Sequence, residues 1–418
     1  MMTEQTHENR QYQSLWGMIE QEQEATSDIV RLGIGNTSVV YTDDGVVVID
    51  MPLGNRFGRK AVEAIRKRTD KPMYAIIYTH GHIDHIWSVP AFFADAEAHK
   101  CAMPHIIGHK NVARRFDRYQ RLKGQHEHIN TIQFAIPAGQ PVLPQHFYYP
   151  DITFDDAMQF NLGGLTFGLY SYYGETDDSL WVWIPERKTA LVGDLLIGGV
   201  PNIGNPFKVQ RWALEWAQAL EAVAGKNPEF VVSAGQVLGK DLAKDVLLDT
   251  ARYLRLMEDE VVRLLNEGCW IEDIIDKIKI PEDLAQKQWL QPIYGHPTFV
   301  IHGVHRRYAG WYNGNPSELF PARSAEIAAE LVKMAGGDKI LQEAQRLKAD
   351  GKIQLSLNVI DFVVKGTQDK SLQKEALLLK SELLKARADV EQSYIARNIF
   401  RAGAALSKQE ADGLSRQP

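Results

Sequence analysis

The sequence has little cysteine, no long apolar run and no excess of positive charge. Its 418 residues include 2 cysteines, Cys101 and Cys269, whose wide separation excludes a disulfide framework and a cysteine-rich zinc site. Apolar runs stay below the ~18 residues that a membrane-spanning helix needs, and the polar start MMTEQTHENRQYQ has no apolar signal core. We therefore expect a cytoplasmic protein in which histidines and carboxylates hold any metal.

The charge balance argues against a nucleic-acid partner, and the lack of a long apolar run argues against a membrane partner. Lys and Arg total 47 against 53 for Asp and Glu, which gives a net charge of -6 instead of the basic footprint that nucleic-acid binding needs. A hydrophobic fraction of 44% and a charged fraction of 24% are ordinary for globular proteins. The length is enough for two or three domains.

The first ~240 residues alternate strand-like and helix-like segments. Apolar runs at 39–41 and 46–50, separated by the turn Asp43-Asp44-Gly45, predict two strands, and GRKAVEAIRKRT at 58–69 predicts a helix. Further strands are expected at 73–78, 165–170, 180–184, 189–193 and 230–233. Strands joined both by turns and by helices indicate an α/β fold with helices outside two sheets, an αββα sandwich.

From about residue 241 the strand signals nearly vanish. Apolar residues at helical spacing predict a helix around 247–265 and another around 327–334, the latter ended by Gly336-Gly337. Further helices are expected at 338–349, 353–365, 371–388 and 391–406. The sequence thus predicts a catalytic domain at 1–240 and an all-helical domain at 241–410.

The clearest chemical signal is the segment Thr79-His80-Gly81-His82-Ile83-Asp84-His85, which follows the predicted strand 73–78. On such a loop His80 and His82 can point to one side, and Asp84 and His85 to a second point nearby. Imidazoles with a carboxylate suit zinc, with manganese or iron as alternatives. The alternative is a polar loop with scattered histidines. Three of the 13 histidines fall within six residues here, which argues against a chance distribution.

This pattern resembles the HxHxDH signature of the metallo-β-lactamase superfamily. Glu175, in the segment 173–180, stands where that family has the histidine of a Gly-His-Thr motif, and Asp194 matches its Gly-Asp landmark. The resemblance implies that Glu175 is a ligand and that Asp194 bridges two metals, although either could be an ordinary turn acid. Gln236 stands where the family's last histidine is expected. This leaves open a weaker second site, a ligand from elsewhere, or a single metal.

The carboxylate at position 175 and the helical half are similar to the alkylsulfatase branch. Residues 302–316 resemble the start of its dimerisation domain, which implies a homodimer. Typical long alkylsulfatases continue into a sterol-carrier-like domain, before which this sequence stops. In that branch an Asn and an Arg bind the anionic ester. Asn202 matches the former, while Lys208 or Arg211 is expected to replace the latter, unless both merely solvate a helix start.

Taken together, these residues predict a metal-dependent hydrolase with one or two Zn²⁺ per chain. His80, His82 and Glu175 are expected to hold the first metal, Asp84 and His85 the second, and Asp194 to bridge. A metal-bound hydroxide, oriented by Asp84 as the catalytic residue, would attack a small anionic substrate, with sulfate esters leading. One alternative is a lactone, lactam, thioester or phosphoester hydrolase. Another is a non-catalytic metal-binding dimer that has lost activity through Gln236.

Overall fold

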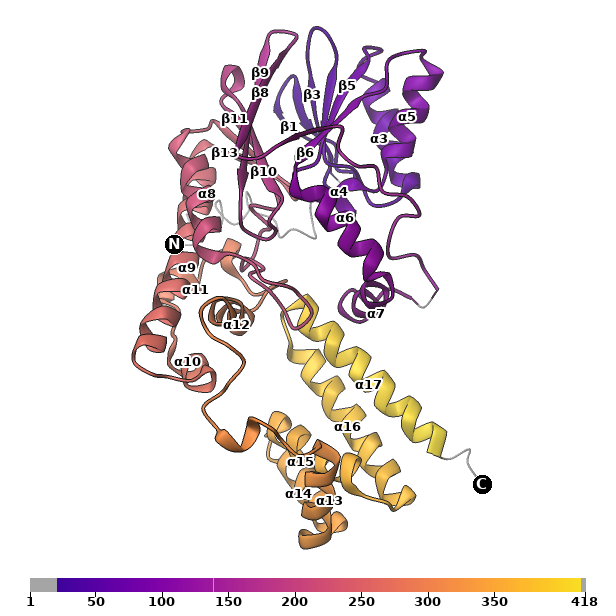
Figure 1. The fold of residues 1–418 in the computed structure, drawn as a ribbon, viewed down its shortest axis with the longest axis vertical. Helices are drawn as coiled ribbons and strands as arrows, with labels where there is room; N and C mark the ends of the chain where they lie inside the picture. Colours follow the sequence, from indigo (N-terminus) through magenta and orange to yellow (C-terminus); the bar gives the residue numbers. More distant parts are fainter. Residues whose placement is uncertain (1–20, 138, 415–418) are drawn as a thin grey trace, which may run out of the picture. The chain divides into compact units, whose positions relative to one another are not determined.

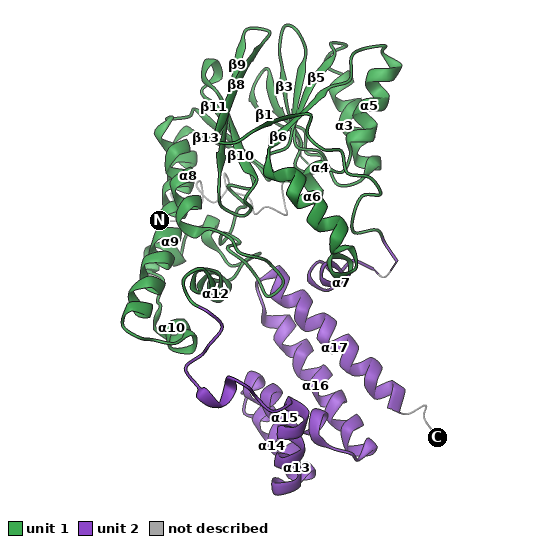
Figure 2. Ribbon diagram, viewed as in Figure 1, with its two compact units in different colours: residues 1–127, 141–309 green, residues 128–140, 310–418 purple. Residues whose placement is uncertain are grey.

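The computed structural model describes residues 21–137 and 139–414. Two compact units are present, as Figure 2 shows: Met1–Glu127 with Pro141–Ala309, and His128–Gln140 with Gly310–Pro418. We call them unit 1 and unit 2. Unit 1 contains both β-sheets, and unit 2 is built from helices.

The first sheet of unit 1 has seven strands in sequence order, β1 to β7. Their bounds are β1 Gln23–Thr26, β2 Ile29–Arg31, β3 Ser38–Tyr41, β4 Val46–Ile49, β5 Met73–Ile77, β6 His105–His109 and β7 Ile152–Phe154. Strands β1 to β4 are antiparallel neighbours, whereas β4 to β7 run parallel. The predicted hairpin around Asp43-Asp44-Gly45 is confirmed as β3–β4, and Thr42 Oγ1 accepts the N–H groups of Asp44 and Gly45 in its turn.

The second sheet has six strands in the order β13-β12-β11-β10-β9-β8. Their bounds are β8 Ala157–Leu162, β9 Leu165–Tyr172, β10 Ser179–Ile184, β11 Thr189–Gly193, β12 Phe230–Ser233 and β13 Val237–Gly239. β11 and β12 are parallel, and the other pairs are antiparallel.

The two sheets pack face to face. The position of strand β4 explains why its sequence is apolar throughout. Val47 and Ile49 point into the core between the sheets, while Val46 and Val48 point toward the helices on the other side. A strand covered on both faces needs an uninterrupted run of apolar residues. Figure 1 shows the sheets side by side, with helices α3 and α5 beyond one and α8 beyond the other. The αββα sandwich is therefore confirmed.

The helices of unit 1 cover the outer faces of the sheets. Apolar residues of α3, α5 and α6 pack on the first sheet, and those of α8, α9 and α12 pack on the second. The bounds are α3 Asn55–Arg66, α4 Ile83–Ile86, α5 Val89–Ala98, α6 Asn111–Arg121, α8 Ala213–Gly225, α9 Lys240–Asn266, α10 Ile271–Lys277, α11 Glu282–Ala285 and α12 Pro297–Tyr308. Helix α7, Lys123–Gln133, begins in unit 1 and continues into unit 2 from His128. The expected domain boundary at residue 240 thus falls inside unit 1, and the limits 1–240 and 241–410 stay a prediction.

Unit 2 is a helical assembly with its own core, as expected. Its longer helices are α13 Ser324–Ala335, α14 Gly337–Ala349, α15 Ile353–Gly366, α16 Lys370–Val390 and α17 Tyr394–Leu414. Leu341, Ile360 and Leu383 come from three of these helices and pack into one apolar cluster. In the described parts of the chain, no helix has the length and apolar character needed to cross a membrane.

Candidate metal centre

Strand ends bring the candidate residues to one edge of the sandwich. The parallel pairs β4–β5 and β11–β12 end at Ile49, Ile77, Gly193 and Ser233, and the loops that follow carry most of the predicted residues. Leu180 N donates to Thr79 O at 2.7 Å, which joins the two sheets at this edge. The carboxyl ends of parallel strands are the usual position for a binding site.

Four predicted ligands converge there: His80, His82, Glu175 and Asp194 each offer an atom, and all four atoms lie within 4.8 Å of one another. His80 Nε2 is 2.8 Å from His82 Nδ1. It is also 3.8 Å from Glu175 Oε2 and 3.8 Å from Asp194 Oδ2. We call these residues the four-ligand group. They come from the loop after β5, the turn before β10 and the end of β11.

The four-ligand group has the chemistry of a cation site. Glu175 Oε2 is buried and has no hydrogen-bond partner among the described residues, although it lies 3.6 Å from His82 Nδ1. Burial lowers the pKa of His80 and of His82 well below the usual value, so both rings are neutral and keep a lone pair for a metal. Burial also raises the pKa of Asp194 to about 7. Two imidazoles and two carboxylates suit a divalent ion such as zinc.

Asp84 and His85 lie beside this group. His85 Nε2 is 3.6 Å from Asp84 Oδ2 and 3.5 Å from Asp194 Oδ2, so Asp194 has His80 on one side and His85 on the other. Burial disfavours the charged ring, but the carboxylates of Asp50, Asp194 and Asp84 raise the pKa of His85 above its usual value. The structure therefore gathers all six predicted ligands at one edge of unit 1.

Asp50, which follows β4, supports this edge and was not singled out from the sequence. Its carboxylate accepts hydrogen bonds from Thr79 N at 2.8 Å and Thr79 Oγ1 at 2.7 Å, and its Oδ2 is 2.8 Å from His85 Nδ1. Such a contact fixes the ring of His85 and directs its Nε2 toward the site. The signal in the sequence was an acid directly after an apolar strand.

The loop that carries His80 and His82 is held by a second buried acid. Asp178 accepts hydrogen bonds from Gly81 N at 3.0 Å and from Arg115 Nε at 2.8 Å, and Arg115 Nη2 also reaches Asp177 Oδ1 at 2.6 Å. The Arg115 guanidinium lowers the pKa of Asp178 against the opposing effect of burial. Asp178 and Arg115 act through the loop backbone, which sequence reasoning could not foresee.

Two of the residues predicted to bind substrate contact the ligand Glu175. Arg211 Nη1 donates to Glu175 Oε1 in a buried ion pair, and Asn202 Nδ2 donates to the same oxygen at 3.2 Å. Arg211 Nη1 also donates to the backbone oxygen of Asn202 at 2.7 Å. These contacts hold Glu175 Oε1 and leave Oε2 directed at the two histidines.

Lys208 is the third of these residues. Burial, together with the nearby charge of Arg211, lowers the pKa of Lys208 to about 7, while Glu175 and Asp84 act in the opposite direction. Lys208 therefore lies within electrostatic range of the ligands Glu175 and Asp84. Burial lowers the pKa of His126, on α7, to about 4, and the positive charge of Lys208 adds to this effect.

Gln236 follows β12 and is almost fully buried. Its backbone is bonded to Ser233, and its side-chain Oε1 has no hydrogen-bond partner within residues 21–137 and 139–414. The histidines of the helical half, His296, His302 and His305, do not join the four-ligand group. His296 instead accepts a hydrogen bond from Thr298 N at the start of α12.

Comparisons with known proteins find relatives for both halves of the chain. Residues 30–235 match the family model of the metallo-beta-lactamase superfamily, and residues 270–410 match that of alkyl sulfatase dimerisation. A linear primary-alkylsulfatase of Pseudomonas sp. (strain ATCC 19151) is 24% identical over 403 residues, which cover 90% of this chain and 74% of the relative. An (R)-specific secondary-alkylsulfatase of Pseudomonas sp. is 22% identical over 397 residues, covering 88% of this chain and 59% of the relative.

A solved structure shows the same fold. The stereoselective inverting sec-alkylsulfatase from Pseudomonas sp. superimposes with a TM-score of 0.81 at 19% sequence identity. The match covers 93% of this chain and 65% of that one, so the chain spans about two thirds of the length of this neighbour.

Proposed function

The chain belongs to the metallo-β-lactamase superfamily and carries an alkylsulfatase dimerisation domain, and from this premise we propose that it is a metal-dependent hydrolase of sulfate esters. The observation that carries the proposal is the four-ligand group, in which two neutral imidazoles face the unpartnered oxygen of Glu175. The cationic Lys208 nearby offers a partner for an anionic ester.

In this proposal His80, His82, Glu175 and Asp194 hold the ion, with zinc as the first candidate and manganese or iron as alternatives. Such an ion acts as a Lewis acid and lowers the pKa of bound water, so that hydroxide is available near neutral pH. The chain's own residues bind and orient the substrate. Lys208 attracts the sulfate oxygens, and Asn202 and Arg211 keep Glu175 in place.

Asp84 is the proposed catalytic residue. Its side chain is 48% exposed, in contrast to the buried ring of His85 beside it, so the carboxylate is accessible to water. A carboxylate in this position can orient the attacking water and accept its proton. The ester then breaks into an alcohol and sulfate.

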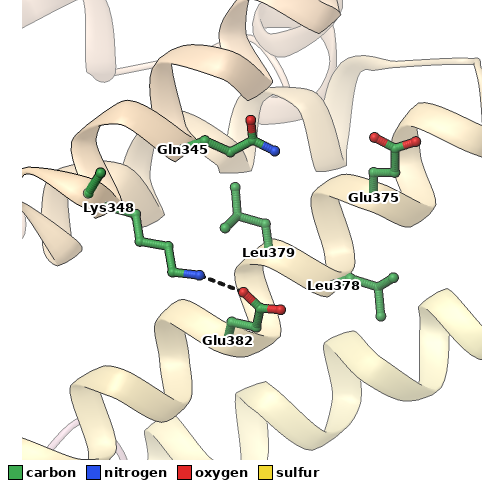
Figure 3. Close-up of a pocket in the computed structure, with 7 residues that line it drawn as sticks. Gln345, Lys348, Glu375, Leu378, Leu379 and Glu382 are labelled. Atoms are coloured by element: carbon green, nitrogen blue, oxygen red, sulfur yellow. Dashed lines mark hydrogen bonds and ion pairs between the residues drawn. The ribbon is translucent and has the colours of Figure 1, made fainter.

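A homodimer is the proposed assembly, with a second copy of the chain covering apolar side chains of unit 2. Residues 270–410 match the dimerisation model, and large apolar side chains of this region are exposed, among them Met334 at 78% and Val390 at 72%. Figure 3 shows a hollow between α14 and α16 whose lining includes the ion pair of Lys348 Nζ and Glu382 Oε2 at 2.6 Å. Leu378 and Leu379 give this lining an apolar part. Apolar surface of this kind commonly marks a protein contact.

The test is hydrolysis of a panel of alkyl sulfates of different chain length by the metal-loaded protein. We expect release of inorganic sulfate, lost in His82→Ala but kept in the matched control His99→Ala, which changes a histidine outside the four-ligand group. In oxygen-labelled water, label in sulfate indicates S–O cleavage and label in the alcohol indicates C–O cleavage. Failure on every alkyl sulfate refutes the assignment. Turnover of lactones or thioesters instead would identify the acyl alternative, and no turnover at all would favour the non-catalytic metal-binding dimer.

A further inference from the structure

We propose that the chain binds a single catalytic ion, and that the side-chain amide of Asn36 takes the place of a second ion between Asp84 and His85. This inference rests on the proposed function for the first ion but not on the identity of the ester. It selects the single-metal outcome from the three that Gln236 left open in the sequence.

Asn36 contacts both residues that were predicted to hold the second metal. Its Nδ2 is 2.8 Å from His85 Nε2, 3.2 Å from Asp84 Oδ2 and 3.4 Å from the backbone oxygen of Asp84. The two oxygens of Asp84 require a hydrogen-bond donor, which fixes the amide nitrogen on this side. The NH₂ group of Asn36 thus faces His85 Nε2 and Asp84 Oδ2, the two atoms that a second cation would need as ligands.

The Nε2 lone pair of His85 is engaged by Asn36 in the neutral ring and absent in the protonated ring. In the neutral ring, the proton on Nδ1 faces Asp50 Oδ2 at 2.8 Å, and Nε2 accepts the N–H of Asn36. In the protonated ring, Nε2 carries a proton itself. A metal has to displace one or the other, and an amide nitrogen is not a ligand that replaces imidazole.

The loop before β3 is built to hold Asn36 in this position. Gly33 and Gly35 adopt positive φ angles of 68° and 57°, which glycine tolerates best, and Leu32 N closes the loop on Thr37 O at 3.0 Å. A β-carbon at Gly35 would lie 3.0 Å from Pro52 Cβ, so the loop packs closely. The position of Asn36 is therefore set by its backbone.

A buried arginine joins the two loops that lie at the second position. The Arg31 guanidinium donates to Gly35 O at 3.2 Å and to Ala234 O at 3.0 Å, which joins the loop of Asn36 to the loop of Gln236. Burial lowers the pKa of Arg31 to about 10, so the side chain stays charged at neutral pH.

Gln236 completes the contrast between the two positions. The four-ligand group offers two imidazoles and two carboxylates, whereas the second position has Asp84, an engaged His85 and an amide in place of the expected histidine. An amide oxygen is a weak ligand for zinc. One position is complete within the described residues, and the other is filled by an amide.

Metal stoichiometry tests the inference without relying on activity. The protein is stripped with a chelator, reloaded with excess Zn²⁺, desalted and analysed by mass spectrometry for metal per chain. We expect about one equivalent in the wild type and in Asp84→Ala, and less than about 0.2 in His82→Ala, because only the last removes a ligand of the occupied site. A Co²⁺ absorption titration should saturate at the same value.

Variants open the second position. The double variant Asn36→Ala/Gln236→His should bind about two equivalents, since it frees His85 and adds an imidazole. The matched control Asn161→Ala, which changes an exposed asparagine of β8, should keep one. If the double variant fails to fold by circular dichroism, the wild-type value still decides.

The outcomes separate this inference from the proposed function. Two equivalents in the wild type overturn the single-ion inference, even where sulfate esters are cleaved. One equivalent without turnover of any sulfate ester supports the inference and overturns the sulfatase assignment. No bound metal in the wild type overturns both.

Discussion

Glu175 and Arg211 form a buried ion pair at the candidate metal centre, with relative exposures of 6% and 3%. A histidine at position 175, as the broader sequence motif expects, would be neutral as a ligand. The glutamate brings a negative charge that the Arg211 guanidinium offsets, while Asn202 shares the same oxygen. Removing one partner of a buried pair leaves an uncompensated charge, which costs on the order of 3–5 kcal/mol.

Arg211→Ala is therefore expected to weaken metal binding by roughly 10–100-fold, because Glu175 loses the contact that orients it. Competition with a chelating dye on stripped protein measures this directly. The matched control is Arg252→Ala, which breaks an exposed ion pair with Asp283 and should leave the affinity unchanged. Unchanged metal affinity combined with a raised KM would instead make Arg211 a substrate-binding residue, as the sequence first suggested.

Lys208 gives the proposed activity a pH dependence. Burial lowers the pKa of Lys208 to about 7, so its positive charge is present below that pH and is lost above it. If the charge binds the sulfate group, KM should rise about tenfold for each pH unit above about 7. In Lys208→Arg the side chain stays charged, and the rise should disappear. Steady-state kinetics across this range measure the effect, and identical profiles for both proteins would exclude the role.

Among the secondary-structure elements, β5 and β11 carry the parts of the centre that the sequence revealed. Their apolar runs end directly at Thr79-His80 and Gly193-Asp194, so local pattern alone predicts polar residues at the carboxyl ends of strands. Asn36 and Asp50 could not be assigned this way, because their roles depend on how β2 to β5 pair in the sheet. Arg211 was assigned to substrate, because its partner Glu175 lies 36 residues away in the chain.

The end of β11 also depends on close packing that only glycine permits. Gly193 has a φ angle of 49°, and a β-carbon there would lie 2.5 Å from Thr79 Oγ1. Gly193→Ala should cost about 2–4 kcal/mol of unfolding free energy and lower the metal content, since Thr79 contacts both Asp50 and His80. Urea denaturation measures the first effect. The control Gly225→Ala, at the end of α8 with open space around it, should leave the unfolding free energy nearly unchanged. If Gly193→Ala were as stable as the wild type, this account of the packing would be wrong.

On the scale of the whole molecule, the described candidate residues all belong to unit 1, whereas most of the match to the dimerisation model falls in unit 2. Unit 2 has a separate apolar core. Changes to its surface should therefore alter assembly without removing any ligand of the metal centre.

Analytical ultracentrifugation at micromolar concentration should give a mass twice the 47.2 kDa of one chain. Ile327 and Met334 are exposed on α13 seven residues apart, which puts them on one face of the helix. Replacing both with glutamate should produce monomers, because charge in an apolar interface is costly. The control Leu53→Glu changes an exposed leucine of unit 1 and should stay dimeric. A monomeric wild type would contradict the proposed assembly.

Anomalous X-ray diffraction from crystals of the zinc-loaded protein tests the metal centre most directly. One strong peak is expected at about 2.0–2.2 Å from the ligand atoms of His80, His82, Glu175 and Asp194. A map with no peak among these four side chains, or with the zinc bound elsewhere, would contradict the proposed centre.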